Sequence, residues 1–293
     1  MLRLDRLTRR FGGHVAVDDV SFEVGDGQLV GFVGGNGAGK TTTMRMVMGV
    51  LQASAGEVRW NDAPVTAIDR REFGYMPEER GLYPKQPVLE QVAYLAQLHG
   101  VSAHDARERG TALLDRFGLA DRAKDKLEAL SLGNQQRVQI VAAVIARPKM
   151  LVLDEPFSGL DPGAVDDMVA LLREFTSTGT PVLFSSHQLD LVERLCDRIV
   201  ILSRGRVVAD GVADELRRSG PLRHRLVTGN DAGWVRDLGW LDVIDVGGDT
   251  AVVQLAAAED TDRLLTEALR RGSVRELAEI VPSVADIYRE VTA

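Results

Sequence analysis

The stretch that decides the fold reads LVGFVGGNGAGKTT, from Leu29 to Thr42. Its first five residues are apolar or glycine and predict a buried strand, and the segment from Thr41 to Leu51 predicts a helix. Between them, Gly34 to Thr41 matches G-x-x-x-x-G-K-[ST], a phosphate-binding loop that joins a strand to a helix. A chance match is expected on the order of once per hundred chains of this length. We therefore expect this loop to bind phosphate.

The loop supplies the first set of candidate binding residues. Its glycines let the backbone curl so that several N–H groups point at phosphate oxygens, and the helix N-terminus adds positive potential. We expect Lys40 to reach the β- and γ-phosphates and Thr41 to offer its hydroxyl to Mg²⁺. The nucleotide-binding candidates here are Gly34, Asn36, Gly37, Ala38, Gly39, Lys40, Thr41 and Thr42.

A second buried strand ends in two carboxylates. The apolar residues 150–153 place Asp154 at the carboxyl end of the strand, where ligands bind in open α/β sheets. Asp154 would hold Mg²⁺ through its water shell, and Glu155 would polarise a water for in-line attack on the γ-phosphate. An apolar run ending in Asp-Glu is a weak signal alone. Downstream of a phosphate-binding loop it becomes a strong one.

The order of patterns along the chain predicts an α/β fold, namely a P-loop NTPase core sheet with an all-helical insertion. Short apolar runs alternate with helical patterns, which is typical of a largely parallel sheet. Residues 181–184 predict a strand, and residues 162–177 an amphipathic helix. From about residue 88 to 147 every periodic segment is helical. Residues 199–209 predict a hairpin that closes this unit.

A boundary is predicted at Ser219-Gly220-Pro221. It separates an ATPase-type domain of residues 1–219 from a domain of residues 220–293. The second part reads strand, helix, strand, strand, helix, strand, with a hairpin signal at Gly247-Gly248-Asp249. This βαββαβ order predicts a small α+β domain of the ferredoxin-like type. One extra helix is expected at residues 283–291.

Composition narrows the class of protein further. The chain is 45% hydrophobic and 27% charged, as globular proteins are. A formal net charge of -8 offers no general basic surface, so we do not expect a nucleic-acid partner. Cys196 is the single cysteine and lies in a helical apolar pattern, which predicts a small core residue. No apolar run approaches the roughly 20 residues of a membrane span, and we expect a soluble chain.

Four further elements extend the pattern. They are LSLGNQQR at residues 130–137, SGLD at 158–161, SSH at 185–187, and Phe11, which lies 23 residues before Gly34. Together with the phosphate-binding loop and Asp154-Glu155, they resemble the six ordered motifs of the ABC ATPases. The resemblance covers roughly residues 1 to 215. Its specificity rests on order and spacing rather than on any single match.

This resemblance implies roles for five residues. Phe11 would stack on adenine, and His187 would contact the γ-phosphate. Ser131 and Gly133 would contact the γ-phosphate of ATP held by a second subunit, and Asp161 would lie across that dimer interface. Taken alone, Phe11 also fits a core aromatic residue, His187 a capping histidine and Ser131 a helix N-cap.

The resemblance also implies the ligands and partners. ATP and Mg²⁺ are the expected cofactors, and the expected partners are membrane permease subunits and a second copy of the chain, with a heterodimer as the alternative. We expect the protein on the cytoplasmic face of the cell membrane. The catalytic candidates are Glu155, His187 and Lys40. The metal candidates are Thr41, Glu78 and Asp154.

Three positions depart from the family pattern. The signature is commonly Leu-Ser-Gly-Gly-Gln, whereas Leu132 and Asn134 occur here beside the retained Ser131 and Gly133. Gly35 stands where proline is frequent. Glu78 stands where the family places a glutamine that senses Mg²⁺ and the attacking water. Glu78 would still bind a metal through an oxygen, or it is a plain loop residue.

A second resemblance concerns the direction of transport. Residues 77–84, PEERGLYP, resemble a subset of ABC ATPases that serve small bacterial exporters of drugs, lipids or sodium ions. Residues 222–293 look similar to an accessory domain of that subset. The alternative class is an ABC ATPase that acts in repair, translation or regulation. The chain shows neither a long coiled-coil pattern nor a second phosphate-binding loop, as those proteins would. A P-loop nucleotide kinase is a third class.

Overall fold

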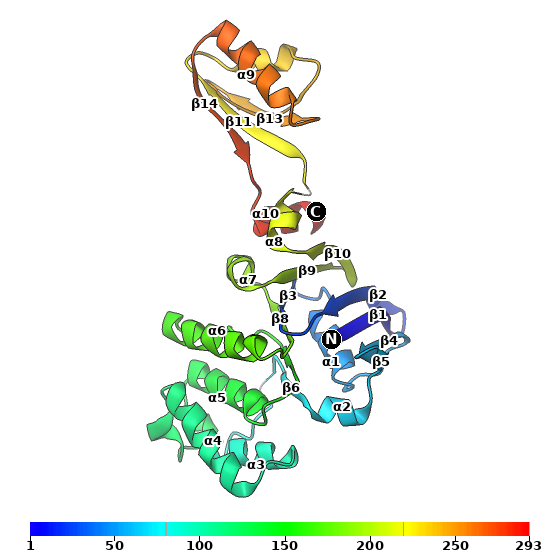
Figure 1. The fold of residues 1–293 in the computed structure, drawn as a ribbon, viewed down its shortest axis with the longest axis vertical. Coiled ribbons are helices and arrows are strands. Elements are labelled where there is room, and N and C mark those ends of the chain that lie inside the picture. The colour runs from blue at the N-terminus through cyan, green and yellow to red at the C-terminus, as the bar shows by residue number, and fades with distance from the viewer. Residues whose placement is uncertain (80, 219, 293) are drawn as a thin grey trace. The chain divides into compact units, whose positions relative to one another are not determined.

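A computed structural model describes residues 1–79, 81–218 and 220–292 of the chain. By its internal contacts the chain divides into two units, Met1–Ala213 and Asp214–Val291 (Figure 1). Ser219, which belongs to the predicted boundary, lies outside the described residues. Each unit is described by itself below.

The first unit is built on a six-stranded sheet. Its strands follow the order β10 (Arg206–Gly211), β9 (Arg198–Ser203), β3 (Leu29–Gly34), β8 (Val182–Ser186), β7 (Met150–Leu153) and β6 (Phe73–Met76). All neighbours pair in parallel except β10, which pairs with β9 in antiparallel fashion. Every residue of β3, β7 and β8 is buried. Burial on both faces explains why these strands are continuous apolar runs, and the predicted parallel core sheet is confirmed.

Three helices pack against this sheet. They are α1 (Lys40–Val47), α6 (Pro162–Ser177) and α7 (Leu189–Leu195), and each contacts β3. Cys196 directly follows α7, and its thiol lies against β3, because a Cβ at Gly31 would come within 2.7 Å of the sulfur. Burial raises the pKa of this thiol well above its ordinary value.

An antiparallel sheet that the sequence analysis did not predict completes the unit. Its strands follow the order β2 (His14–Val24), β1 (Leu2–Phe11), β4 (Ala55–Trp60) and β5 (Ala63–Pro64), and α2 (Ala67–Arg71) follows them. Apolar side chains of this sheet, of α1 and of β3 form one core cluster. Within it the rings of Phe22 and Phe32 lie 5.2 Å apart. This contact joins the two sheets around α1.

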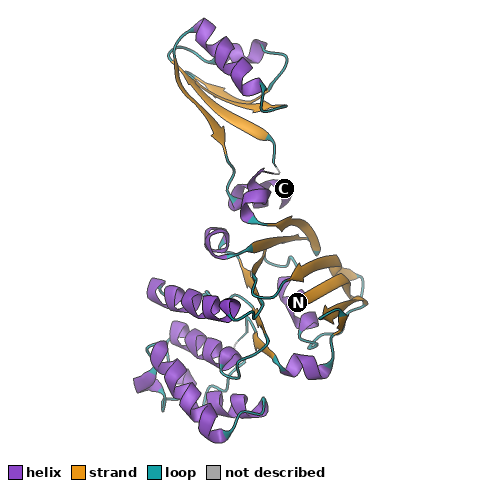
Figure 2. Cartoon of the chain, in the orientation of Figure 1, coloured by secondary structure: helices purple, strands orange, loops and turns teal. Residues whose placement is uncertain are grey.

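The described residues between β6 and β7 form helices and loops without a strand (Figure 2). In chain order the helices are α3 (Val88–Leu98), α4 (Ala103–Arg116), η1 (Ala120–Arg122), η2 (Leu127–Ala129) and α5 (Leu132–Val144). Helices α3, α4 and α5 contact one another. The predicted all-helical insertion is therefore confirmed.

Two predicted element ends, those of α1 and β8, are wrong. Helix α1 ends at Val47 rather than at Leu51, because the chain turns at Gly49, whose φ of 71° is left-handed. Strand β8 continues past the predicted end at Phe184 and includes Ser185 and Ser186. The longer strand carries a polar residue into the buried sheet, and that residue matters for the site.

The second unit forms an antiparallel sheet with helices. Its elements are α8 (Ala213–Arg218), β11 (Leu222–Thr228), η3 (Gly233–Asp237), β12 (Asp242–Gly247), β13 (Thr250–Leu255), α9 (Asp260–Arg271), β14 (Val274–Ile280) and α10 (Val284–Thr292). The strand order β12-β13-β11-β14, with all neighbours antiparallel, is that of the ferredoxin-like arrangement. The fold predicted for the C-terminal part is confirmed. None of the helices in the described ranges combines the length and the hydrophobicity that crossing a bilayer requires.

A buried histidine makes the stability of this second unit depend on pH. His224 lies on the inner face of β11 with Nε2 3.2 Å from Thr261 Oγ1, and its Nδ1 has no hydrogen-bond partner among the described residues. Burial lowers the pKa of His224, while the charge of Glu279 acts in the opposite direction. The unfolded chain therefore binds this proton at a higher pH than the folded chain does.

We predict that the free energy of unfolding falls as pH is lowered through the ordinary histidine pKa of about 6.5. Thermal unfolding of a Trp60→Phe chain, followed by the fluorescence of Trp234 and Trp240, measures this between pH 7.5 and 5.5. His224→Gln should reduce the pH dependence. His104→Gln, at an exposed position on α4, should leave it unchanged. Equal slopes in all three chains would contradict the assignment.

Candidate nucleotide-binding site

The phosphate-binding loop runs from the end of β3 into the start of α1. Gly37 and Gly39 have left-handed φ values of 76° and 108°. A Cβ at Gly39 would lie 2.6 Å from the Ala16 carbonyl oxygen, so glycine is required there by both conformation and space. No side chain caps the N-terminus of α1. Its first N–H groups are therefore available to an anionic ligand.

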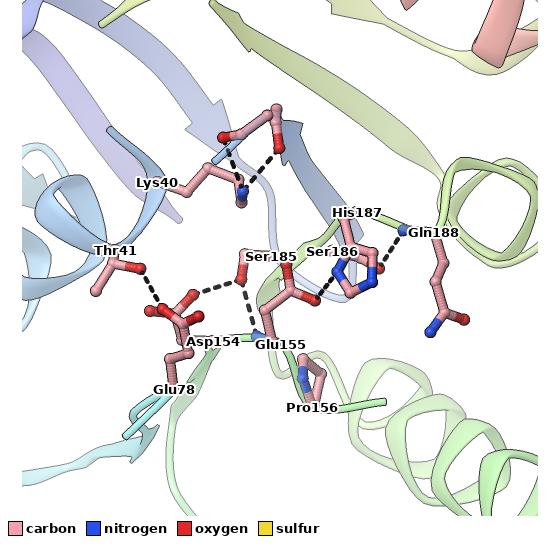
Figure 3. A network of polar contacts seen from close by, with 12 residues as sticks. Lys40, Thr41, Glu78, Asp154, Glu155, Pro156, Ser185, Ser186, His187 and Gln188 are labelled. Atoms are coloured by element: carbon pink, nitrogen blue, oxygen red, sulfur yellow. Dashed lines mark hydrogen bonds and ion pairs between the residues drawn. The ribbon is translucent and has the colours of Figure 1, made fainter. Parts of the chain in front are cut away.

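Lys40 is held over this loop. The side chain is 8% exposed, and Nζ donates to the carbonyl oxygens of Gly34 at 2.7 Å and Gly35 at 3.4 Å (Figure 3). An ammonium group has three donors. Two of them are used in these contacts, which fix the charge beside the loop and leave one donor for a phosphate oxygen.

Asp154 lies at the carboxyl end of β7 and is 1% exposed. Its Oδ1 accepts a hydrogen bond from Ser185 Oγ at 2.5 Å, whereas its Oδ2 has no hydrogen-bond partner among the described residues. Burial raises the pKa of Asp154, the hydroxyls of Ser185 and Thr41 lower it, the charge of Glu78 raises it, and the charge of Lys40 lowers it. A buried carboxylate oxygen without a partner is suited to a cation.

Glu78 lies beside this carboxylate. Thr41 Oγ1 donates to Glu78 Oε2 at 3.1 Å, and Thr41, Glu78 and Asp154 line one cavity. The three predicted metal candidates are therefore together. They present one hydroxyl and two carboxylates, which are the oxygen ligands that Mg²⁺ accepts. The donor set fits Mg²⁺.

Glu155 is held from three directions. Its N–H donates to Ser185 Oγ at 2.8 Å, and its carbonyl accepts from Gln136 Nε2 of α5 at 3.0 Å. Its Oε2 lies 2.9 Å from His187 Nδ1 (Figure 3). The backbone of Glu155 is left-handed, with φ of 52°. Such a conformation is costly for a non-glycine residue and persists where the surroundings impose it, often at functional sites.

These groups meet in one cavity of about 420 Å³. It is lined by Phe11, His14, Ala16, Asn36, Gly37, Gly39, Lys40, Thr41, Thr42, Glu78, Asp154 and Glu155. Two loop candidates do not line it: the Gly34 carbonyl accepts from Lys40, and the Ala38 carbonyl accepts from the Gly205 N–H. His187 reaches the site through its contact with Glu155.

Phe11 lines the cavity from the end of β1. Its ring is 47% exposed, and the Arg9 guanidinium lies 4.6 Å from the ring centroid. The alternative of a core aromatic residue is therefore excluded. An exposed ring at the mouth of a polar cavity offers a flat surface to a base.

Three candidates lie outside this cavity. Ser131 caps α5, with its hydroxyl 3.4 Å from the Asn134 nitrogen, and Asp161 caps α6 and pairs with Arg137. At Gly133 a Cβ would come within 2.8 Å of the Gly159 carbonyl oxygen. None of the three lines the cavity of its own chain.

Sequence reasoning missed Ser185, Gln136 and His14. Ser185 is part of the SSH motif, but its bonds to Asp154 and Glu155 span about thirty residues and join two strands, so no local pattern shows them. Gln136 lies within the LSLGNQQR motif and bonds to the Glu155 carbonyl. His14 lines the cavity from the start of β2. No sequence signal singles it out.

A strand-loop-helix cradle with a fixed lysine, faced by a buried aspartate and a strained glutamate, defines the site of a P-loop nucleoside triphosphatase. The sequence pattern of the family described as ABC transporter matches residues 17–158. The pattern described as "ATP-binding protein DrrA1-3-like, C-terminal domain" matches residues 211–292. The chain belongs to the ABC transporter ATP-binding family, and it is an ATPase that binds ATP.

Similar proteins cover from three quarters to nearly all of the chain. The ABC transporter ATP-binding protein YhaQ of Bacillus subtilis is 37% identical over 296 residues, covering 99% of this chain and 98% of its own. The lipopolysaccharide export system ATP-binding protein LptB of Escherichia coli is 32% identical, covering 78% and 98%. A solved ATP binding subunit of an ABC transporter superposes with a TM-score of 0.70 at 34% identity, covering 75% of this chain and 92% of that one.

We predict that Ser185→Ala lowers the ATP hydrolysis rate by roughly 10- to 100-fold, the usual cost of removing a group that orients a metal-binding or catalytic carboxylate. The substitution leaves Asp154 without its hydrogen bond and frees the Glu155 backbone. Steady-state phosphate release measures the effect. Ser186→Ala is the matched control. In Figure 3 the Ser186 hydroxyl accepts a hydrogen bond from the Gln188 N–H and makes no drawn contact with Asp154 or Glu155. Equal rates in both variants would contradict this role.

Proposed function

We propose that the chain is the ATP-hydrolysing subunit of an ABC exporter and drives a separate membrane permease by ATP-dependent closure of a homodimer. The observation that supports this proposal is that the predicted site residues fall into two separate groups. The phosphate cradle, Asp154 and Glu155 share one cavity, whereas Ser131 and Gly133 lie at an exposed helix start outside it. Neither half surrounds a γ-phosphate alone, and a second copy supplies what the first lacks.

The chemistry follows from the cavity. Thr41, Glu78 and Asp154 would hold Mg²⁺, which supplies neutralisation of phosphate charge when bound. Lys40 directs its remaining ammonium donor to a phosphate oxygen and stabilises the charge that develops there. Glu155 positions the attacking water and accepts its proton. His187 holds the Glu155 carboxylate in one orientation and reaches the γ-phosphate with its other ring nitrogen. Phe11 stacks on the adenine.

The surface at the start of α5 supports the dimer. Leu132 is 64% exposed beside Ser131, so its apolar side chain is available to a partner surface. The Ser131 hydroxyl caps one N–H group of α5, and the helix dipole adds positive potential at this N-terminus. Placed against the γ-phosphate in the other subunit, it closes the open side of the phosphate. We propose that Asp161 lies in the same interface.

We predict that Glu155→Gln traps this dimer. The substitution keeps the size of the side chain and removes the carboxylate that activates water, so ATP persists in the site. Light scattering should then show the molar mass doubling from 31.9 kDa on addition of ATP.

The control adds Ser131→Arg to the Glu155→Gln chain. Its own cavity is intact and should still bind ATP, but the added side chain obstructs the partner's γ-phosphate and the mass should stay monomeric. A Glu155→Gln chain that binds ATP and remains monomeric would contradict the homodimer and favour a heterodimer.

A second cavity supports the permease contact. It has a volume of about 470 Å³ and lies among residues of β6, α2, α3 and α5, including Arg70, Arg71 and Arg147. Gln139 of α5 lines it at 4% exposure, and both atoms of its amide lack a hydrogen-bond partner among the described residues. A buried amide without partners costs free energy unless a ligand completes it. We propose that a segment of the permease enters here, next to the loop that follows Glu78.

We predict that Gln139→Leu separates docking from folding. It removes an unsatisfied amide, so the isolated chain should unfold at a higher temperature, with about 1–3 kcal/mol of added stability. Association with the proposed permease subunit should weaken by at least about tenfold, measured by co-purification in detergent. Gln97→Leu, on the exposed part of α3, is the control. Unchanged association of the Gln139 variant would contradict the docking site.

The direction of transport rests on similarity. The linearmycin resistance ATP-binding protein LnrL of Bacillus subtilis is 32% identical and covers 74% of this chain, and LptB is named for lipopolysaccharide export. We propose export of a drug, lipid or ion from the cytoplasmic face of the membrane. We also propose residues 1–219 and 220–293 as the ATPase and accessory domains, the latter stabilising the dimer. A chain that neither dimerises nor binds a membrane protein would instead be a non-transport ABC ATPase.

A further inference from the structure

The cavity that is proposed to take polyanionic ATP is itself lined by more negative than positive groups among the described residues. Among the described residues that line it, three carry carboxylates, Glu78, Asp154 and Glu155, and one, Lys40, carries an ammonium group. The third carboxylate, Glu155, has a partner in His187. Among the described residues, Glu78 accepts a hydrogen bond from the Thr41 hydroxyl and Asp154 accepts one from the Ser185 hydroxyl, and both partners are neutral. The charge of Lys40 acts on Asp154, but no other cationic side chain among the described residues lines the cavity, so negative charge exceeds positive charge on this side.

The negative charge of Glu78 is not needed for its hydrogen bond with Thr41. The Thr41 hydroxyl donates to Glu78 Oε2 at 3.1 Å, and the amide oxygen of a glutamine would accept the same bond. The carboxylate therefore keeps this bond in common with its isostere and differs from it in charge and in having a second acceptor oxygen where glutamine has an NH₂ donor. Like charges a few ångströms apart repel strongly at a protein surface, so this charge acts against the phosphates of ATP. It acts in favour of any divalent cation between Thr41 and Asp154.

The cation position is prepared before a nucleotide arrives. Asp154 Oδ2 is buried without a partner, and the Thr41 hydroxyl and the Glu78 carboxylate are already in contact beside it. These groups come from α1, from the end of β7 and from the loop after β6, and they need no phosphate oxygen to bring them together. A cation ligand set with two carboxylates holds a divalent cation by its charge as well as by geometry.

We propose that Glu78 makes this site dependent on a divalent cation in two ways: its charge excludes metal-free ATP, and with Thr41 and Asp154 it holds the cation without nucleotide. The proposal rests on the ATP site proposed above and specifies the form of substrate that the site accepts. Since binding linkage is reciprocal, a cation already in place raises the affinity for ATP as much as ATP raises the affinity for the cation.

Two binding measurements on the full chain test this. The first is Mn²⁺ binding to the nucleotide-free protein by electron paramagnetic resonance. The second is binding of a fluorescent, non-hydrolysable ATP analogue in EDTA. Glu78→Gln should weaken Mn²⁺ binding and tighten binding of the metal-free analogue, each by roughly tenfold, which corresponds to about 1.4 kcal/mol. A misfolded variant would weaken both, so the opposite signs identify the charge effect.

Glu79→Gln is the matched control. Glu79 is adjacent and highly exposed, lies 3.9 Å from Arg45, and does not line the cavity. It should change neither affinity. Equal shifts in the two variants, or a Glu78→Gln variant with both affinities unchanged or both weakened, would overturn the proposal. Failure of the ATP site itself is separate: the unaltered chain would then not bind the analogue in Mg²⁺ either.

Discussion

The Ser185 hydroxyl is the single group on which the geometry of the site depends. It donates to Asp154 Oδ1 and accepts from the Glu155 N–H, so one oxygen positions two successive carboxylates with different roles. Because β8 lies between β3 and β7, the same strand also borders the phosphate loop. The parallel sheet thus sets the spacing between the loop and the carboxylates. The Ser185 hydroxyl then fixes the Asp154 carboxylate and the Glu155 backbone in place. The left-handed backbone of Glu155 is tolerable because that bond and the one from Gln136 hold it.

Among the described residues, two of the buried polar groups without a hydrogen-bond partner lie beside cavities. Most buried polar groups in folded proteins are paired. Here Asp154 Oδ2 and the Gln139 amide are not, within the described residues, and each lines a cavity. One is an anionic oxygen beside a hydroxyl and a second carboxylate, which suits a cation. The other is a neutral amide among arginines, which suits a polypeptide segment. Both cavities have α5 and β6 as neighbours, so these two elements connect the two sites.

The parts of the fold that follow from local patterns were predictable. The bounds of α6 and β7 agree with the sequence expectation, because a proline start and a four-residue apolar run mark them directly. The antiparallel sheet of β1, β2 and β4 was missed, since its strands carry many charged residues on the exposed face and their pairing is set by distant contacts. In the site, the loop and Asp154-Glu155 were predictable from spacing. Ser185 and Gln136 act through tertiary hydrogen bonds, and these have no local signature.

The packing of Cys196 has a practical consequence. A thiol reacts as the thiolate, and this one lies against β3 with its ionisation suppressed by burial. The chain is therefore close to a cysteine-free background as it stands. A spin label or fluorophore attached to a cysteine introduced at position 132 would be the one probe to react under native conditions. The distance between two such probes could then be followed through a hydrolysis cycle in the unmodified scaffold, without first replacing a residue that supports the central sheet.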